Sequence, residues 1–297
     1  MSNKTKIHWC DGTVNPVMGC NGCELWAPRL KSCYAGVMHE KWSNNIGYSP
    51  SFSLPKLFPG RMAKAAKWSN LTGTARPGKP WLDGLPRLIF VSDMGDALSA
   101  RNAIGPDNKP VRGGAVPFEF LKQEIIDAAT SEAGSRHLWL WLTKRPDRMA
   151  QFSQWLQKKF DRDIPRNVWV GTTVTMNATL KRIDDLIQVG NKRTVRFLSV
   201  EPLWEEISLA RKLKGIHWVI VGGESKQKKD IEAKEFRCEW VRRLRDECVK
   251  AHVPIFIKQL GGNATIGGES VGLKGSHGED WSQWPEDLRV RQMPEVK

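Results

Sequence analysis

The sequence predicts an α/β protein built as a (β/α) barrel, complete or partial. Two observations support this prediction: apolar segments of strand length alternate with amphipathic segments, and most of the apolar segments are continuous runs. Continuous β-branched and aromatic runs are typical of parallel strands that are buried on both faces. Repeated strand–helix units indicate a parallel sheet, and a closed or nearly closed barrel is favoured here over an open sheet.

Each element follows from its local pattern. The six clearest expected strands cover residues 87–92, 137–143, 167–174, 195–200, 217–223 and 254–259. A further strand, the first in the chain, is expected near residues 6–10. The expected helices cover residues 117–131, 146–160, 177–190 and 236–252. Prolines and glycines at the junctions support these boundaries.

The length of 297 residues suits one large domain or two modest ones, and we expect a single domain over 1–297. Residues 38–85 form an expected insertion after the cysteine-rich segment, and residues 261–297 an expected C-terminal extension. The longest apolar runs are far shorter than the roughly 20 residues that a membrane helix needs. The first residues, MSNKTKIHWCDG, have no apolar signal-peptide core, which favours a cytoplasmic protein without membrane contact.

The net charge of +14 favours a polyanionic partner. The basic residues come in short groups and not in one long run, which indicates basic patches on a folded surface. We therefore expect a nucleic acid or a nucleotide as substrate. The alternative is that the charge is spread over solvated faces and serves solubility.

Polar residues follow six successive expected strands. In a (β/α) barrel the working residues gather at these carboxyl ends, so the set predicts a polar ligand site. Its members are Ser92, Asp93 and Asp96; Thr143, Lys144 and Arg145; Thr172, Thr173 and Asn177; Ser199 and Glu201; Gly222, Gly223, Glu224 and Ser225; and Lys258 and Gln259.

Three cysteines, Cys20, Cys23 and Cys33, follow the expected first strand, so their loop is expected at the same rim. In a cytosolic chain of this size such thiols are metal ligands or buried thiols rather than disulfides. Three thiolates suit a [4Fe–4S] cluster with one open iron, whereas addition of Cys10 gives a four-cysteine pattern that suits zinc. Spacing alone leaves both open. Cys238 and Cys248 are expected to be ordinary buried thiols.

Seven blocks along the chain carry a family resemblance. They are TVNPVMGCNGCELWAPRLKSCYAG, FVSDMGD, LTKRP, VWVGTTV, FLSVEPL, WVIVGGES and FIKQLGG. Together they resemble a family of phage and mobile-element proteins (phage Gp37/Gp68-like) known by its three-cysteine motif and related to radical S-adenosylmethionine (SAM) enzymes. The resemblance implies a barrel of the radical-SAM, TIM-like type in the cytoplasm of a bacterial host or phage-infected cell.

The resemblance also implies a function. Cys20, Cys23 and Cys33 would bind a [4Fe–4S] cluster, and SAM would be cleaved to a 5′-deoxyadenosyl radical that modifies a nucleic acid base or nucleotide. Reduction would need a partner protein, and a neighbouring protein partner is also implied. The expected catalytic side chains are Lys144, Glu201 and Lys258. The expected contacts of SAM are Ser92, Asp93, Thr143, Thr172, Glu201, Gly222, Gly223 and Glu224.

Two departures from the radical-SAM pattern matter. The cysteine spacing is C-x2-C-x9-C instead of C-x3-C-x2-C, and GGES follows the sixth strand while SDMGD follows the second. Ser92 and Asp93 are therefore the expected contacts of the SAM amino group, and Gly222 to Glu224 an edge near the ribose or substrate. Two alternatives stay open: a radical-SAM lyase that reverses a DNA lesion, and a non-catalytic nucleic-acid-binding protein held together by zinc or a cluster.

Overall fold

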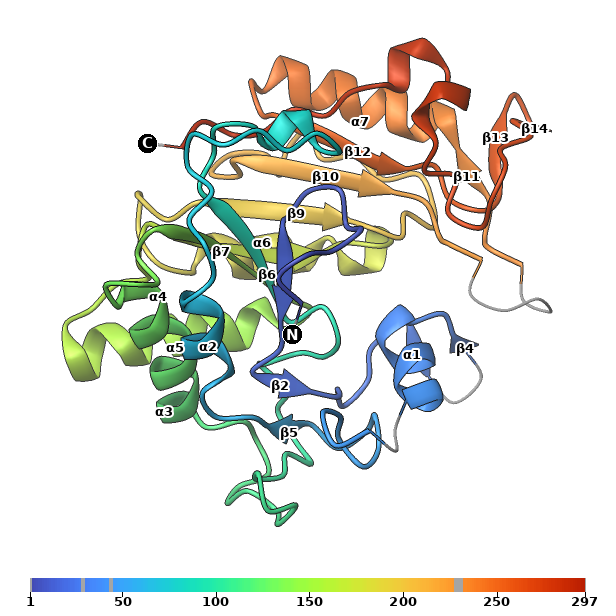
Figure 1. Cartoon of the computed structure of the whole chain (residues 1–297). Coiled ribbons are helices and arrows are strands. Elements are labelled where there is room, and N and C mark those ends of the chain that lie inside the picture. Colours follow the sequence, from blue (N-terminus) through green and yellow to red (C-terminus); the bar gives the residue numbers. More distant parts are fainter. Residues whose placement is uncertain (1, 28–29, 43–44, 227–231, 297) are drawn as a thin grey trace.

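The computed structural model describes residues 2–27, 30–42, 45–226 and 232–296. Its centre is a sheet of seven parallel strands in which spatial order equals chain order, β1-β6-β7-β8-β9-β10-β12 (Figure 1). The strands are β1 (Gly12–Val14), β6 (Arg87–Val91), β7 (His137–Thr143), β8 (Val168–Thr173), β9 (Arg196–Val200), β10 (Trp218–Gly222) and β12 (Ile255–Gln259). Six of the expected strands are thus confirmed to within two residues at each end, and the first begins at Gly12 rather than near residue 6.

Helices connect these strands. They are α1 (Tyr34–Trp42), α2 (Arg61–Ala66), α3 (Phe118–Leu121), the π-helical segment η2 (Lys122–Asp127), α4 (Ala128–Thr130), α5 (Pro146–Phe160), α6 (Lys181–Ile187) and α7 (Cys238–Lys250). Single-turn helices are η1 (Pro80–Leu82), η3 (Asn177–Thr179), η4 (Trp281–Gln283) and η5 (Glu286–Leu288). The four expected helices are therefore present, the first as the continuous run α3–η2–α4.

Short strands form three small sheets. They are β2 (Val17–Met18) with β5 (Lys56–Leu57), β3 (Trp26–Ala27) with β4 (Leu30–Lys31), and β11 (Phe236–Arg237) with β13 (Ala264–Ile266) and β14 (Glu269–Ser270). In Figure 1, α1 and the β11–β13–β14 sheet lie on the side toward which the arrows of β9 and β10 point. These additions therefore surround the carboxyl ends of the main strands.

The two faces of the sheet have different cores. On β7, Trp139 and Trp141 pack into a large cluster that includes the helices, whereas Leu138 and Leu140 pack into a second cluster on the opposite face. That second cluster is rich in aromatic side chains: Trp9, Phe90, Trp169, Phe197, Trp218 and Phe256. Burial on both faces explains why the strand sequences are continuous apolar runs.

The expected (β/α) barrel is wrong, because the seven-stranded sheet is open and has two unjoined edges. At one edge, the N–H and C=O of Thr13 in β1 pair with Ser2. At the other edge, β12 pairs with the C-terminal segment around Arg291 in an antiparallel bridge. Both outer strands therefore hydrogen-bond to other segments, so β1 and β12 do not pair with each other to close a barrel.

Residues 5–10, here called the N-terminal strap, cross the aromatic face without joining the sheet. The ammonium of Lys79 donates to the carbonyls of Thr5, Ile7 and Cys10 at 2.8, 2.6 and 2.5 Å. The indole N–H of Trp81 donates to the carbonyl of His8 at 2.8 Å. Side-chain donors thus replace the strand partners that the sequence predicted for this segment.

The segment 38–85 contributes both to the core and to the rim. Met62, Ala65 and Ala66 of α2 belong to the helix-side core, and Leu82 of η1 belongs to the aromatic core. The C-terminal residues after 261 add β13, β14, η4 and η5 and cover the free edge of β12. Among the described residues, none of the helices has both the length and the apolar character that crossing a bilayer requires.

Candidate functional site

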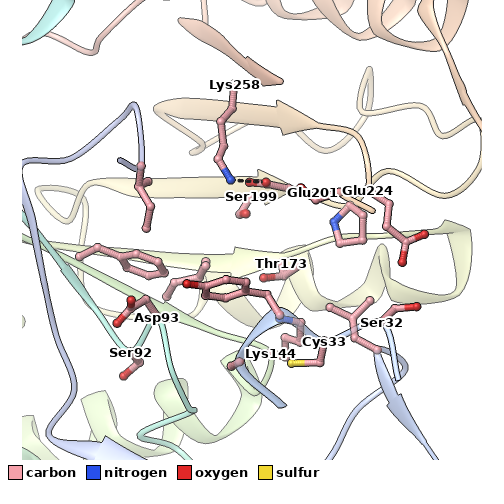
Figure 2. Close-up of a pocket in the computed structure, with 18 of the residues that line it drawn as sticks. Ser32, Cys33, Ser92, Asp93, Lys144, Thr173, Ser199, Glu201, Glu224 and Lys258 are labelled. Carbon is pink, nitrogen blue, oxygen red and sulfur yellow. Dashed lines mark hydrogen bonds and ion pairs between the residues drawn. The ribbon is translucent and has the colours of Figure 1, made fainter. Parts of the chain in front are cut away.

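A cavity of about 570 Å³ lies at the carboxyl ends of the strands. This volume is within the range of roughly 300–1,000 Å³ that is usual for small-molecule sites. Polar residues from the ends of β6 to β12 line it, together with the strap, the cysteine-bearing loop and the C-terminal extension. Figure 2 shows Ser92, Asp93, Lys144, Cys33, Thr173, Ser199, Glu201, Glu224 and Lys258 around this space.

The three clustered cysteines all line this one cavity. Cys20 is buried, and Cys23 and Cys33 are half-buried. Cys20 follows the short strand β2, and Cys33 directly precedes α1. The sequence prediction that the cysteine loop meets the polar strand ends therefore agrees with the arrangement of this structure.

A close backbone approach positions this loop. A Cβ added to Gly95, after β6, would lie 2.6 Å from the carbonyl oxygen of Gly19, so no side chain fits there. The amide of Asp96 donates to the same carbonyl oxygen at 3.3 Å. The glycines of MGC and DMGD thus let the loop lie directly against the end of β6.

Arg145 connects the loop to the sheet. Its guanidinium donates to Asp96 Oδ2 at 2.7 Å and to the carbonyl of Gly22 at 2.9 Å. Both of its Nη atoms lie 3.6 Å from Cys20 Sγ. Burial raises the pKa of Cys20 to about 11, and the charge of Arg145 opposes that rise. Burial also acts to raise the pKa of Asp96, but Arg145 and the surrounding donors outweigh it and lower that pKa.

Lys144 lies beside the other two thiols. Burial acts to lower its pKa, yet the nearby Cys23 and Cys33, together with Glu24 and Asp96, outweigh that effect and raise it. Within the described ranges its ammonium group has neither a hydrogen-bond nor an ion-pair partner, and it lines the cavity. A cation is therefore available next to Cys23 and Cys33 for a ligand that carries negative charge.

Buried polar atoms without partners surround the cavity. Ser92 Oγ, Thr173 Oγ1, Trp9 Nε1 and His8 Nδ1 have no hydrogen-bond partner in the described part of the chain, and their four residues all line the cavity. Ser92 also has a φ of +78°, a strained conformation for a serine. Unpartnered buried groups are costly, so these four groups are suited to hydrogen-bond with a polar ligand.

Two carboxylates mark the ends of β9 and β10. Glu201 forms an ion pair with Lys258, which is drawn as a dashed line in Figure 2. Glu224 accepts hydrogen bonds from the indole of Trp204 at 3.3 Å and from the amide of Lys234 at 2.9 Å. Asp93, at the end of β6, accepts from Asn15 Nδ2 at 2.5 Å, and burial raises its pKa.

Three predicted contacts are placed differently. Thr143 lines the cavity, but its hydroxyl donates to the carboxylate of Asp96 at 2.8 Å. The hydroxyl of Thr172 donates to the carbonyl of Thr143 at 2.9 Å, and Thr172 is not part of the lining. Its neighbour Thr173 lines the cavity instead, since successive strand residues face opposite sides. Gly222 lies against Glu201, outside the lining, while Gly223 and Glu224 belong to it.

Sequence reasoning missed the residues that come from the two ends of the chain. His8 and Trp9 of the strap, and His277 and Glu279 of the C-terminal extension, line the cavity. His277 Nδ1 lies 2.7 Å from the hydroxyl of Ser225. No local pattern marks these residues, because only the three-dimensional path of the chain ends brings them to the cavity.

Cys10 is separated from the three cavity cysteines. It is fully buried in the aromatic cluster, does not line the cavity, and burial strongly raises its pKa. Cys20 belongs to a different cluster that includes Phe52 and Cys33. The four-cysteine zinc arrangement therefore gains no support from the structure. Cys238 and Cys248 are buried in the helix-side core, which confirms that expectation.

The chemistry of the available donor atoms decides whether an iron–sulfur cluster suits this cavity. Within the residues that the structure describes, no three His, Cys, Asp or Glu side chains are already arranged to hold one metal ion. The thiols of Cys20, Cys23 and Cys33 nevertheless line a common space beside Lys144 and Arg145. Thiolates are the ligands of iron–sulfur clusters, and the adjacent cations would offset their negative charge. The residue types around the cavity therefore fit an iron–sulfur cluster.

Comparison with known proteins gives one result. A family model described as "Protein of unknown function (DUF5131)" matches residues 4–285. The chain belongs to that family. The DUF5131 match spans all seven main strands and the cysteine-bearing loop, but its description states no activity. The phage-protein relationship and the radical-SAM chemistry therefore stay predictions. No curated protein matches the chain, and no solved structure does.

Proposed function

We propose that this DUF5131 protein is a radical-SAM-like iron–sulfur enzyme that modifies a nucleic acid base or a nucleotide. The observation that supports this most is the joint placement of Cys20, Cys23 and Cys33 in one cavity with unpartnered polar groups. A bound and reduced cluster would supply the electron that cleaves SAM to methionine and the 5′-deoxyadenosyl radical, which takes a hydrogen atom from the substrate.

The residues around the thiols would hold the cofactors. Cys20, Cys23 and Cys33 would be the cluster ligands, and Lys144 and Arg145 would offset the negative charge of three thiolates. Arg145 would also keep the loop in place, since it contacts Cys20 Sγ, the Gly22 carbonyl and Asp96.

The polar groups of the cavity would orient SAM and the substrate. Ser92 and Asp93 at the end of β6 would receive the SAM amino group, for which a hydroxyl and a carboxylate are suitable acceptors. Thr173, whose hydroxyl is unpartnered, takes the place that the sequence assigned to Thr172. Glu224 would accept from ribose hydroxyls, because its carboxylate lines the cavity beside Gly223.

Glu201 and Lys258 would act near the substrate. Their ion pair lines the cavity at the ends of β9 and β12. A paired carboxylate and ammonium can accept and donate a proton without a net change of charge in the cavity. The basic net charge of +14 supports a nucleic acid or nucleotide partner. A cytoplasmic location and a separate reductant protein are parts of the same proposal.

The test is SAM cleavage. Protein reconstituted with iron and sulfide under anaerobic conditions should release 5′-deoxyadenosine when a reductant and SAM are added. Ser92→Ala combined with Thr173→Val should weaken SAM binding by about tenfold or more, because two hydrogen-bonding groups are lost. Ser135→Ala combined with Thr74→Val makes the same chemical changes at two exposed positions outside the cavity and serves as the matched control. Iron-loaded protein that neither binds nor cleaves SAM would contradict the proposal.

A further inference from the structure

The strap end of the cavity is formed by both ends of the chain. Its lining residues are Thr5, Lys6 and His8 of the strap, Lys258 at the end of β12, and His277 and Glu279 of the C-terminal extension. The proposed cofactor contacts lie elsewhere in the lining, on the cysteine loop and at the ends of β6, β8 and β10. This end is therefore available for the substrate.

Positive charge is concentrated there. The strongest electrostatic influences on His8 come from three cations, Arg291, Lys258 and Lys79. Three carboxylates counter these cations: Glu201, which is paired with Lys258, Glu279, whose field acts on Arg291, and Asp11, whose field acts on Lys79.

Two of these cations lack a carboxylate partner among the described residues. Lys79 donates only to three main-chain carbonyls. The guanidinium of Arg291 lies against two indole rings, 4.2 Å from the ring centre of Trp81 and 4.5 Å from that of Trp281, and it donates to the carbonyls of Ile257 and Lys258. Half-buried cations that form no direct ion pair are stabilised when an anion binds nearby.

Hydrogen-bond donors accompany this charge. The Nδ1 atom of His8 is buried and without a partner in the described chain. Burial, and then the neighbouring cations, lower the pKa of His8 to about 3, so its ring is neutral near pH 7 and offers one N–H. Thr5 Oγ1 accepts from the amide of Ile7 at 3.2 Å, which leaves the hydroxyl proton free to donate.

We infer that the strap end of the cavity binds a phosphate group of the substrate through His8, Lys6 and Thr5, in the positive field of Lys79, Lys258 and Arg291. The inference rests on the proposed function, which it deepens by assigning a phosphate ester to the substrate. The phosphate is either the terminal group of a mononucleotide or a phosphodiester within a polymer. Both carry the oxyanion that charge-assisted donors recognise.

Calorimetric titration of the metal-free protein tests the inference without any need for a cluster. The probes are thymidine 5′-monophosphate, the dinucleotide TpT and uncharged thymidine, with inorganic phosphate as competitor. We expect the phosphorylated probes to bind at least about tenfold more tightly than thymidine and to be displaced by phosphate. Preference for the monophosphate indicates a free nucleotide, and preference for TpT indicates a polymer.

Variants locate the binding site. Lys6→Gln with His8→Asn should weaken the phosphorylated probes by about tenfold or more and leave thymidine unchanged. Lys250→Gln with His252→Asn makes the same chemical changes at two exposed positions and should alter nothing. Equal binding of thymidine and its monophosphate, or equal losses in both double variants, would overturn the inference. Because no iron is present, this failure is distinct from a failure of SAM cleavage.

Discussion

Cys20 and Cys10 are ten residues apart and both buried, yet they belong to different parts of the molecule. Cys20 lines the cavity, and Arg145 lies 3.6 Å from its sulfur. Cys10, the last residue of the strap, packs among aromatic side chains and does not line the cavity. The difference teaches that proximity in sequence does not assign a thiol to a site. The three-dimensional path of the chain determines whether a thiol lies at the cavity or in the core.

Removal of the Arg145 contacts is expected to have the largest effect on the cavity side. Arg145→Leu leaves the buried carboxylate of Asp96 without its counter-charge and should lower the free energy of unfolding by about 3–5 kcal/mol. Urea denaturation measures this. Lys159→Met, which removes an exposed ion pair with Glu119, should cost under about 1 kcal/mol. Similar losses in both variants would mean that Arg145 does not hold the loop.

Substitution of Cys10 and of Cys20 by serine tests the difference between the two positions. Cys10→Ser places a hydroxyl in an apolar cluster and should lower the free energy of unfolding by about 1–3 kcal/mol. Cys20→Ser keeps a polar atom beside Arg145 and should change the free energy of unfolding by less than about 0.5 kcal/mol. Thermal and urea unfolding of both metal-free variants give the values. A larger loss for Cys20→Ser would reverse the assignment of the two sites.

Neighbouring threonines on β8 provide a smaller contrast. Thr172→Val removes the hydrogen bond to the Thr143 carbonyl and should lower the free energy of unfolding by about 1 kcal/mol. Thr173→Val removes a hydroxyl without a partner in the described chain and should leave that free energy unchanged or slightly raise it. Loss of stability in Thr173→Val alone would show that Thr173 and not Thr172 supports the fold.

The smallest expected effect is a dependence on pH. The folded-state pKa of Asp96 lies below its ordinary value of 3.8, so its ionised form stabilises the fold above that value. This contribution is lost as the pH falls through the folded-state pKa. Below about pH 4 the native protein should therefore lose stability faster than Asp96→Asn, as followed by urea denaturation at successive pH values. Parallel pH profiles would contradict the lowered pKa.

The order of strands was predictable because each strand is a short apolar run with a clear end. The open edges were not, since closure depends on which segments reach the edges. Here Ser2 and Arg291 do so, and neither carries a local signal. A strand was expected at residues 6–10 because the segment is apolar, but Lys79 and Trp81 bind its carbonyls with side-chain donors.

The candidate site was predictable where strand ends carry it. Ser92, Lys144, Glu201 and Lys258 all line the cavity as expected from the parallel arrangement. The assignment failed by one residue at Thr172, because a continuous apolar run hides which of two adjacent side chains faces each side. His8 and His277 could not be found, since the chain ends reach the cavity through tertiary contacts alone.

The central claim is that the cavity thiols, and not Cys10, bind an iron–sulfur cluster. The most direct test is the iron content and visible absorbance of the native protein, Cys20→Ser and Cys10→Ser after anaerobic reconstitution. We predict about four irons per chain in the native protein and in Cys10→Ser, and less than about one in Cys20→Ser. Equal iron in all three proteins, or a single zinc ion that either substitution removes, would contradict the claim.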